Sequence, residues 1–329
     1  MARQARRVPR VQRAHPARSA PRAERRAHDR PRAVTVLVIG EALVDVVQRE
    51  GGDPEPHAGG SPFNVAVGLA RLDVPTLLAA QVGDDAYGDL LREHLYDSEV
   101  GLERLDPVPT RTSSAVATLA EDGSASYDFD LTWDPAALPD AADFEAVHVG
   151  SLGTALEPGA ALVAGLVVSA DVLGIPVSYD PNVRLSVEPD ASVWRGVFDT
   201  IAPHATIIKM SDEDAATLFP GEEPVAVVRR LAADHGIVAM TRGADGAVVG
   251  AGDVLVEVPP AEVRLVDTIG AGDSFMAAML SWCATYEWPS ADELDATELR
   301  DLAMYASSAA AITCSRPGAD PPRTRDLTP

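Results

Sequence analysis

The stretch Val34-Thr-Val-Leu-Val-Ile39, which runs directly into Gly40-Glu41, opens the part of the sequence that has regular structural signals. It is almost entirely apolar, is rich in β-branched residues and shows no alternation of polar and apolar positions. Such a run predicts a strand that is buried on both faces of a parallel sheet. Helices cover both faces of such a sheet, so the segment indicates an α/β fold.

The residues that follow continue an alternation of strands and helices. Ser61 is a suitable N-cap and Pro62 a favoured first residue for the first helix. The patterns predict a strand over 42–50, a loop over 51–60, a helix over 63–72, a strand over 76–82 and a helix over 85–96.

The segment 112–129 interrupts this alternation. Two short runs, 115–119 and 125–129, flank the turn-rich tetrad Glu121-Asp-Gly-Ser124, a pattern that predicts a β-hairpin. A hairpin does not belong inside a wound parallel sheet. Together with the strand near 44–50, it is expected to form a small accessory sheet, a lid built from about 44–60 and 111–130.

From residue 146 the alternation resumes and predicts a doubly wound α/β domain over 34–329 with a small β-sheet lid. The predicted strands are 146–149, 176–179, 206–208 and 237–241, followed by a hairpin of 247–249 and 254–258 and a strand-like segment 262–266. The predicted helices are 158–173, 192–201, 212–219, 224–235, 270–286 and 292–313.

Charge is distributed unevenly along the chain of 329 residues. It has 27 Lys and Arg against 50 Asp and Glu, a net charge of −23, yet the first 33 residues hold eleven arginines and only two acids. The rest of the chain is therefore still more acidic. A body of this charge repels a phosphate backbone, which argues against a nucleic-acid binder unless the basic N-terminus alone does the binding.

The basic segment 1–33 is predicted to be a disordered, Arg- and Pro-rich extension. A polybasic tether for an anionic partner and an organelle transit peptide are the alternatives. The segment lacks the apolar core of a secretory signal, and the longest apolar run, 160–177, is broken by Asp171 and Pro176, so no membrane span is expected. Only two cysteines, Cys283 and Cys314, are present, which indicates a reducing cytoplasm.

The most informative segment is Asp267-Thr-Ile-Gly-Ala-Gly-Asp273, which opens a long apolar helix. Glycines at 270 and 272 let backbone N–H groups converge on one point without interference from a Cβ atom. Such a helix N-terminus is an anion site, because its free N–H groups and the positive end of the helix dipole face the anion. Asp273 suits removal of a proton from a substrate hydroxyl that attacks a phosphoryl group. The simpler alternative is that Asp273 only complements the helix dipole.

This segment is neither a Walker P-loop nor a G-x-G-x-x-G fingerprint, because no Lys-Ser/Thr pair follows it and it does not follow the first strand. Phosphoryl transfer would then depend on Arg184, Lys209, Arg242 and a bound Mg²⁺. Lys209 stands out because it is the only lysine of the chain and comes at the end of a buried strand. A solvated surface lysine is the simpler alternative.

A second cluster, Gly59-Gly-Ser-Pro-Phe-Asn64, places two glycines before a helix and Asn64 in its first turn. The glycines permit a ligand to approach the backbone, and the Asn64 amide offers a donor and an acceptor to the hydroxyls of a polyol. Asp45 would accept hydroxyl protons from the opposite side. Asn64 as a capping residue and Asp45 as a turn residue are the simpler alternatives.

Segments 59–72 and 267–275 resemble the two signature motifs of the ribokinase-like (PfkB) carbohydrate kinases, in the same order and about 200 residues apart. The resemblance covers 34–319, because segments 82–88, 180–184, 209–214 and 241–246 are also similar to the family. Segments 40–45 and 180–184 are most similar to those of bacterial fructokinases.

The resemblance implies a Rossmann-like sheet between helices, a β lid that closes over a sugar, and ATP along the C-terminal half. It implies that Asp273 is the catalytic base, with the N–H groups of Gly270, Ala271 and Gly272 as the anion hole. The implied sugar ligands are Asp45, Gly59, Gly60, Asn64 and Arg184. The implied nucleotide ligands are Lys209, Ser211, Thr241, Gly243, Gly246, Ser307 and Gly318. Asp267 and Thr268 fall where family members place a monovalent cation such as K⁺, and a homodimer through the lid is also implied.

One element departs from the family pattern. The family's Asn-x-x-Glu, which organises Mg²⁺ and phosphate through water, corresponds to Ser211-Asp-Glu-Asp214. Ser at the first position is common in fructokinase-like members, but Asp214 is one methylene shorter than the usual Glu. Mg²⁺ keeps several of its waters, so a shorter carboxylate that acts through water is compatible with this role.

These features predict an ATP-dependent kinase that phosphorylates a primary hydroxyl of D-fructose. The alternatives within this class are 2-keto-3-deoxygluconate, which would need a cation for its carboxylate, ribose, and a nucleoside, which would need an aromatic lid. A non-catalytic sugar or nucleotide sensor on the same fold is the alternative from another class. The intact Asp273 and its glycine turn argue against a sensor, since a pure binder needs no base.

Overall fold

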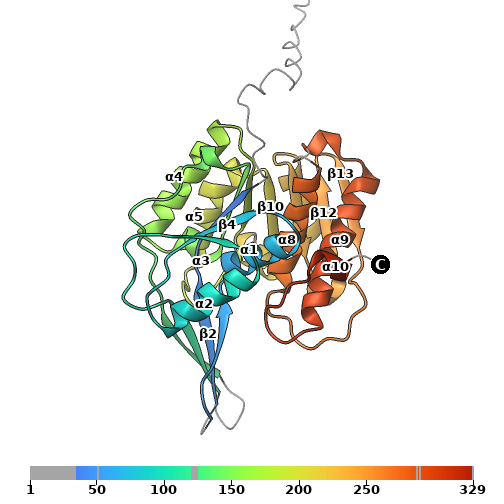
Figure 1. Cartoon of the computed structure of the whole chain (residues 1–329). Coiled ribbons are helices and arrows are strands. Elements are labelled where there is room, and N and C mark those ends of the chain that lie inside the picture. The colour runs from blue at the N-terminus through green and yellow to red at the C-terminus, as the bar shows by residue number, and fades with distance from the viewer. Residues whose placement is uncertain (1–34, 50–51, 120–124, 287, 289, 328–329) are drawn as a thin grey trace, which may run out of the picture. The chain divides into compact units, whose positions relative to one another are not determined.

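The first strand, β1 (Val36–Ile39), is fully buried inside a parallel sheet, as its sequence predicts. It pairs with β4 (Thr76–Ala80) on one side and with β8 (Ala146–Gly150) on the other. The structure, a computed structural model, describes residues 35–49, 52–119, 125–286, 288 and 290–327 (Figure 1). The predicted tail 1–33 and hairpin turn 121–124 lie outside these residues.

The large sheet has nine strands, in the order β13-β12-β11-β10-β9-β8-β1-β4-β5. The neighbours from β5 to β11 are parallel, and the predicted hairpin β12–β13 adds two antiparallel strands. The carboxyl ends of the parallel strands therefore lie along one edge, where ligands bind in open α/β sheets. The strands not yet bounded are β5 (Gly101–Arg104), β9 (Val177–Asp180), β10 (Ile207–Ser211), β11 (Ile237–Thr241), β12 (Ala247–Ala251) and β13 (Val254–Val258).

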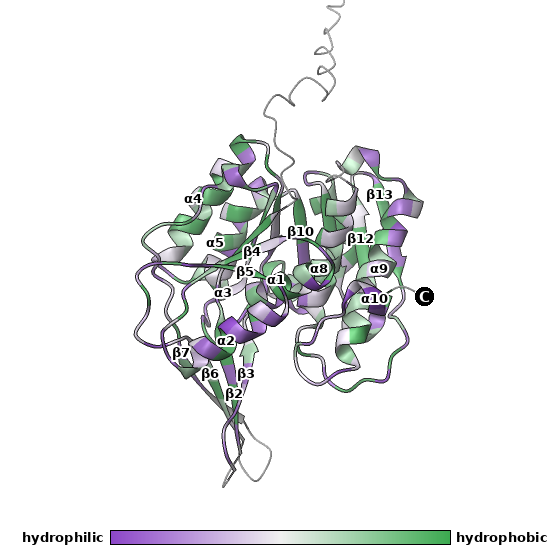
Figure 2. Ribbon diagram, in the orientation of Figure 1, coloured by the Kyte–Doolittle hydropathy of each residue, from purple (hydrophilic) through white to green (hydrophobic). Residues whose placement is uncertain are grey.

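Helices cover both faces of this sheet, which confirms the doubly wound α/β prediction (Figures 1 and 2). Side chains alternate along β1, so that Val36 and Val38 join one core cluster and Leu37 and Ile39 join the other. The first face carries α1 (Ser61–Arg71), α2 (Ala86–Asp97), α8 (Ala271–Thr285), α9 (Ala296–Cys314) and α10 (Thr324–Leu327). The second carries α3 (Ser151–Ala155), α4 (Gly159–Val172), α5 (Ala191–Ile201), α6 (Asp212–Leu218) and α7 (Pro224–Ala232).

A second sheet of four strands, in the order β3-β2-β6-β7, confirms the predicted accessory sheet. Its strands are β2 (Leu43–Arg49), β3 (Glu55–Gly59), β6 (Ser114–Leu119) and β7 (Ala125–Asp130). The prediction of a loop over 51–60 is wrong, because residues 55–59 of this segment form β3. This strand pairs antiparallel with β2 and places His57 opposite Asp45. Pro56 is compatible with this pairing because β3 is an edge strand.

Near the C-terminus one predicted strand is wrong, and one predicted helix is confirmed with a later start. The strand-like segment 262–266 is irregular and largely exposed, because Pro259 and Pro260 end β13 and cannot donate to a ladder. The helix predicted over 292–313 begins only at Ala296, since the Asp295 side chain accepts hydrogen bonds from the N–H groups of Thr297 and Glu298.

Other elements have no counterpart among the predictions, namely β5, α3, α10 and short 3₁₀ turns at Ala141–Asp143, Ala202–His204, Gly243–Asp245 and Ala291–Glu293. The two cysteines, Cys283 and Cys314, are free thiols. Within the part of the chain that the structure describes, every helix is too short or too polar to cross a bilayer.

Candidate active site

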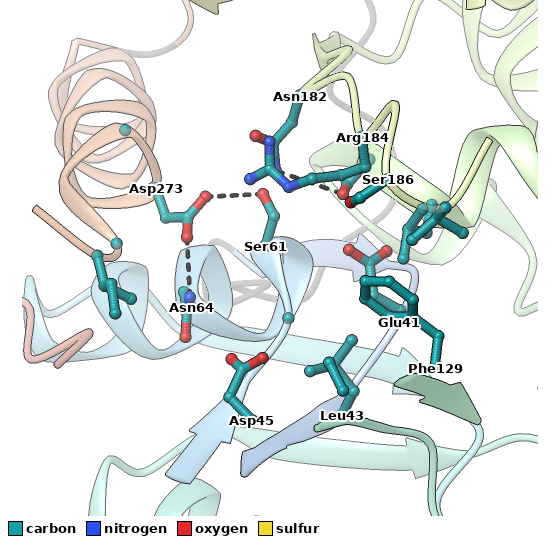
Figure 3. A pocket seen from close by; sticks show the side chains of 18 of the residues that line it. Glu41, Leu43, Asp45, Ser61, Asn64, Phe129, Asn182, Arg184, Ser186 and Asp273 are labelled. Carbon is teal, nitrogen blue, oxygen red and sulfur yellow. Dashed lines mark hydrogen bonds between the residues drawn. The ribbon is translucent and has the colours of Figure 1, made fainter. Parts of the chain in front are cut away.

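A pocket of about 330 Å³ lies at the carboxyl edge of the large sheet, where α1, α8 and the small sheet meet (Figure 3). It brings together both sequence clusters, since Asn64 and Asp273 line it although 209 residues separate them. The predicted site residues in its wall are Asp45, Gly60, Asn64, Arg184, Thr268, Gly270, Gly272 and Asp273. Pocket residues that the sequence did not indicate as site residues include Glu41, Leu43, Ser61, Phe129, Ser151 and Asn182.

Asp273 occupies the first turn of α8 and is only 9% exposed. The Ser61 hydroxyl donates a 2.7 Å hydrogen bond to its Oδ1, and the Asn64 side-chain amide donates a 2.8 Å hydrogen bond to its Oδ2 (Figure 3). The carboxylate is therefore fixed in orientation, while each oxygen keeps a lone pair for a substrate hydroxyl. This arrangement suits a general base.

The Ser61 contact corrects the expected role of that residue. Ser61 was expected to cap α1, but the N-cap is Gly60 and makes no side-chain capping bond. Ser61 is the first residue of the helix, and its hydroxyl bonds Asp273 instead. The alternative reading of Asn64 as a cap is wrong for the same reason, because its amide also bonds Asp273.

The N-terminus of α8 has the geometry expected of an anion site. Gly270, its N-cap, adopts a left-handed conformation with φ 74°. A Cβ atom on Gly270 would lie 2.6 Å from the Cβ of Ala319, and one on Gly272 would lie 2.8 Å from Nζ of Lys209. Position 270 therefore requires glycine, and a side chain at 272 would displace the Lys209 ammonium group. The N–H group of Gly272 has no side chain over it, whereas that of Ala271 donates a 3.3 Å hydrogen bond to the carbonyl oxygen of Thr268.

The two glycines before α1 are also required, but by the protein itself. A Cβ atom on Gly59 would lie 2.3 Å from Oδ2 of Asp45, and one on Gly60 would lie 2.6 Å from the carbonyl oxygen of Glu41. Gly60 has φ 103° as well. The close approach at Gly59 is therefore made by the Asp45 side chain, which lines the pocket from β2, and the one at Gly60 is made by the backbone of Glu41.

Glu41 is a buried acid that the sequence reasoning missed. It is 7% exposed, and its Oε2 accepts a 3.0 Å hydrogen bond from the N–H group of Gly153. Burial raises the pKa of Glu41 to about 7, although hydrogen bonds from Ser151 and from backbone N–H groups counteract this rise. The available signal was its position directly after a buried strand, at the carboxyl edge of the sheet.

The loop after β9, which carries Arg184, is held by Asp214. Oδ1 of Asp214 accepts a 2.7 Å hydrogen bond from the N–H group of Val183, and Oδ2 of Asp214 accepts a 2.8 Å hydrogen bond from the N–H group of Ser211. The Ser211 hydroxyl in turn accepts from the N–H group of Asp214, which completes a capping box for α6. Both carboxylate oxygens are thus engaged by the backbone, and binding of Mg²⁺ through water remains a prediction.

Lys209 is buried rather than solvated. The residue is 3% exposed, and its Nζ donates a 2.8 Å hydrogen bond to Oδ2 of Asp180. The simpler alternative of a surface lysine is therefore wrong. A direct contact with the nucleotide remains a prediction.

The remaining predicted nucleotide ligands, Thr241, Gly243, Gly246, Ser307 and Gly318, are not among the residues that line this pocket. Gly243 and Gly318 adopt positive φ angles and have open space where a Cβ atom would be, so a ligand can approach them. A Cβ atom on Gly246 would lie 2.1 Å from the carbonyl oxygen of Val258, so packing of the β12–β13 hairpin already accounts for that glycine.

Asp267, the predicted ligand of a monovalent cation, accepts hydrogen bonds from the N–H groups of Ile269 at 3.0 Å and Gly318 at 2.9 Å. Partial burial raises its pKa, but these N–H groups outweigh that effect and lower it overall. Across the described residues, no group of three or more His, Cys, Asp and Glu side chains is placed to hold a metal ion.

Comparison with known proteins places this site in a family. The model of the pfkB family of carbohydrate kinases matches residues 34–325. The chain belongs to this family. The match confirms the family predicted from the sequence. A pfkB carbohydrate kinase is a phosphotransferase that acts on sugars.

Relatives of this pfkB kinase include several fructokinases. A probable chloroplastic fructokinase-6 of Arabidopsis thaliana is 33% identical, over 87% of this chain and 79% of that protein. A fructokinase of Klebsiella pneumoniae is 32% identical, over 85% of this chain and 94% of that protein.

Solved structures agree with the fold. The fructokinase of Xylella fastidiosa with bound ATP is 26% identical with a TM-score of 0.74, and the match covers 89% of this chain and 96% of that one. A double mutant of the Vibrio cholerae fructokinase with fructose, ADP and potassium bound is 26% identical with a TM-score of 0.72, over 87% of this chain and 94% of that one.

Proposed function

We propose that this kinase uses ATP to phosphorylate a primary hydroxyl of D-fructose. The observation that carries the proposal is the placement of Asp273, fixed by Ser61 and Asn64 in the first turn of α8 and facing the pocket. A carboxylate beside free helix N–H groups is what transfer of a phosphoryl group to a hydroxyl requires. The fructokinases among the relatives support fructose as the acceptor.

In the proposed reaction, polar groups of the pocket hold the sugar between the small sheet and α8. Asp45 and the side-chain oxygen of Asn64 bind its hydroxyl groups, and one hydroxyl lies against Asp273. Asp273 takes the proton of this hydroxyl as the oxygen attacks the γ-phosphorus. The N–H groups of Ala271 and Gly272 stabilise the negative charge that spreads over the phosphoryl oxygens.

The small sheet acts as a lid in this proposal. It contributes Leu43, Asp45, Ala115 and Phe129 to the wall of the pocket. Its closure over the sugar would exclude water and limit wasteful hydrolysis of ATP. Its edge strands, β3 and β7, suit the predicted homodimer through the lid, which a mass from light scattering would test.

The nucleotide fits the residues present, because Gly243 and Gly318 leave open space and the α8 N-terminus offers free donors. Among the described residues, no group of three or more His, Cys, Asp and Glu side chains could hold a Mg²⁺ ion. Mg²⁺ commonly binds through substrate phosphates and few carboxylates, so it would arrive with ATP. The steps above do not depend on a metal ion held by the protein, and K⁺ at Asp267 and Thr268 is part of the proposal only as a candidate ion.

A second candidate acceptor is 2-keto-3-deoxygluconate, because Arg184 lines the pocket and could pair with its carboxylate. ATP consumption measured over fructose, ribose, 2-keto-3-deoxygluconate and a nucleoside, with NMR of each product, separates these acceptors. The highest kcat/KM on fructose, with the phosphate on a primary hydroxyl, is the expected result. A preference for another acceptor would contradict the proposal for fructose, and ATP-dependent activity on none of them would contradict the proposed reaction.

A further inference from the structure

A pair of buried charges lies between the large sheet and α8. In the parallel register of β9 and β10, Ile207 is opposite Ser178 and Ile208 is opposite Tyr179. Side chains alternate along a strand, so Lys209 projects to the same face as Ile207. Ile207 belongs to the core cluster that contains the apolar residues of α8, and the pair of Lys209 with Asp180 is therefore on the side of the sheet that α8 covers.

The contact of Lys209 with α8 is direct. A Cβ atom on Gly272 would lie 2.8 Å from Nζ and 3.8 Å from Cε of Lys209. Glycine at 272 is thus the residue that makes room for the ammonium group. Gly272 lines the sugar pocket and Lys209 does not, so the ammonium reaches the first turn of α8 from behind the pocket wall.

This pair is poorly explained by stability alone. The side chain of Lys209 is 4% exposed and that of Asp180 is 0% exposed, so both charges have lost their hydration. Oδ1 of Asp180 has no hydrogen-bond partner among the described residues. Ion pairs at such depth are often replaceable by apolar residues at no cost in stability, because desolvation offsets their attraction.

The lysine nevertheless remains charged. Burial alone would lower its pKa, but the negative charges of Asp180, Asp214 and Asp273 outweigh burial and raise the pKa of Lys209. Burial raises the pKa of Asp180 to about 6, and Lys209 counteracts part of this rise. At neutral pH the two side chains therefore form an ion pair, and its positive end, the Lys209 ammonium group, is the end that lies against the first turn of α8.

We propose that Lys209, held by Asp180, is a positioning residue of the anion site: it fixes the first turn of α8 and adds its charge to the field of that helix terminus. The inference rests on the proposed kinase reaction. Negative charge that develops on the transferring phosphoryl group is stabilised most by charges already in place, since a fixed group pays no reorganisation cost. Lys209 would thus act on the phosphoryl group through α8, in place of the direct contact with the nucleotide that the family resemblance implies.

The first test separates catalysis from stability. The double variant Lys209→Met/Asp180→Asn removes both charges at similar side-chain volume. We expect a melting temperature equal to or above that of the wild type, a kcat lowered roughly 10- to 100-fold, and a sugar KM within about threefold. A folded double variant with a kcat within about twofold of the wild type would overturn the proposal.

A matched control is His148→Gln, a change of a buried polar group on the same face of the sheet. His148 bonds Ser178, two residues before Asp180, and burial lowers its pKa to about 3, so it is neutral at pH 7. This variant should keep the wild-type kcat. A kcat lowered as much as in the double variant would show that any disturbance of this face suffices, and would overturn the assignment to charge.

The second test uses the fact that Lys209 is the only lysine. Protein labelled with [ε-¹³C]lysine gives one side-chain NMR signal, which is followed during addition of the magnesium complex of a non-hydrolysable ATP analogue, with binding measured by calorimetry. We expect this signal to shift with the nucleotide analogue and to stay in place with fructose alone. An unmoved signal in the presence of bound nucleotide, or a failure to bind the analogue, would overturn the proposal.

This second test reads binding rather than turnover, so it distinguishes two failures. If no sugar is phosphorylated but the lysine signal shifts on binding, the proposed reaction fails and the assignment of Lys209 to the anion site is supported. If fructose is phosphorylated but the signal does not respond to bound nucleotide, the reaction stands and the role of Lys209 fails.

Discussion

The hydroxyl of Ser61 and the carboxylate of Asp273 are joined by a 2.7 Å hydrogen bond although 212 residues separate them in sequence. Asn64, one turn further along α1, holds the other carboxylate oxygen. The two sequence clusters are therefore parts of one site, in which α1 orients the acid that α8 carries.

Replacement of Asp273 by Asn removes the proposed base while it preserves size. We expect kcat to fall on the order of 10²- to 10⁴-fold with little change in the sugar KM, since the acid–base step is affected more than binding. Steady-state kinetics with fructose measure both constants. Asp253→Asn, on the exposed turn between β12 and β13, is the matched control, and turnover near the wild-type rate in Asp273→Asn would disprove the assignment.

Ser61→Ala removes one of the two hydrogen bonds that orient Asp273. We expect kcat to fall roughly 10-fold, because a hydrogen bond to a charged group contributes about 1.5–3 kcal/mol and part of this is lost in the transition state. The control Ser281→Ala removes a different buried serine hydroxyl, on α8, which donates a hydrogen bond to the carbonyl oxygen of Leu72. Equal kcat values for the two variants would argue against a role of Ser61 in catalysis.

Glu41 should make the stability of the protein depend on pH. Its pKa is about 7 in the folded state, against 4.5 as an ordinary value, so the folded protein keeps this proton while the unfolded chain has released it. The free energy of unfolding should therefore decrease as pH rises from about 4.5 to 7, by about 3 kcal/mol for this group.

Chemical denaturation of wild type and Glu41→Gln at several pH values checks this expectation. The difference between the two free energies of unfolding should change in favour of the variant as pH rises through this range, and then level off. A difference that is constant with pH would show that Glu41 does not titrate in this range.

Asp214→Asn tests whether this acid holds the backbone or organises Mg²⁺. An amide presents one acceptor oxygen where the backbone uses two, so we expect the free energy of unfolding to fall by about 1–3 kcal/mol. The Mg²⁺ concentration for half-maximal activity should stay within about threefold of the wild type. A shift of tenfold or more in that concentration would favour the predicted role in binding Mg²⁺.

Much of the fold follows from local patterns. The buried run 34–39, the alternation of strands and helices after it and the two hairpins predict the doubly wound sheet and the accessory sheet, because each segment has a clear local signal. β3 was missed because Pro56 and the neighbouring acid weaken its strand signal, and its pairing depends on the edge of a sheet that only the tertiary fold creates. The late start of α9 depends on one capping residue, Asp295, at the kind of boundary that patterns define least well.

The candidate site was predictable where residue type and chemistry coincide. Asp273 follows a glycine turn at a helix N-terminus, a combination for which the proposed role in phosphoryl transfer has few structural alternatives. Ser61 and Glu41 were missed because a serine before a helix more often caps it, and an acid after a strand more often meets water. Their actual contacts depend on how α1 and β1 pack against distant segments, which a linear pattern does not specify.

The contact between α1 and α8 also bears on biosynthesis. Ser61 and Asn64, which orient the proposed base, emerge early from the ribosome, whereas Asp273 and the turn proposed to bind the phosphoryl group emerge near the end. A nascent or truncated chain that lacks α8 has no base to hold, so it cannot consume ATP by this reaction. Enzyme activity therefore reports that both ends of the domain have been made and have docked.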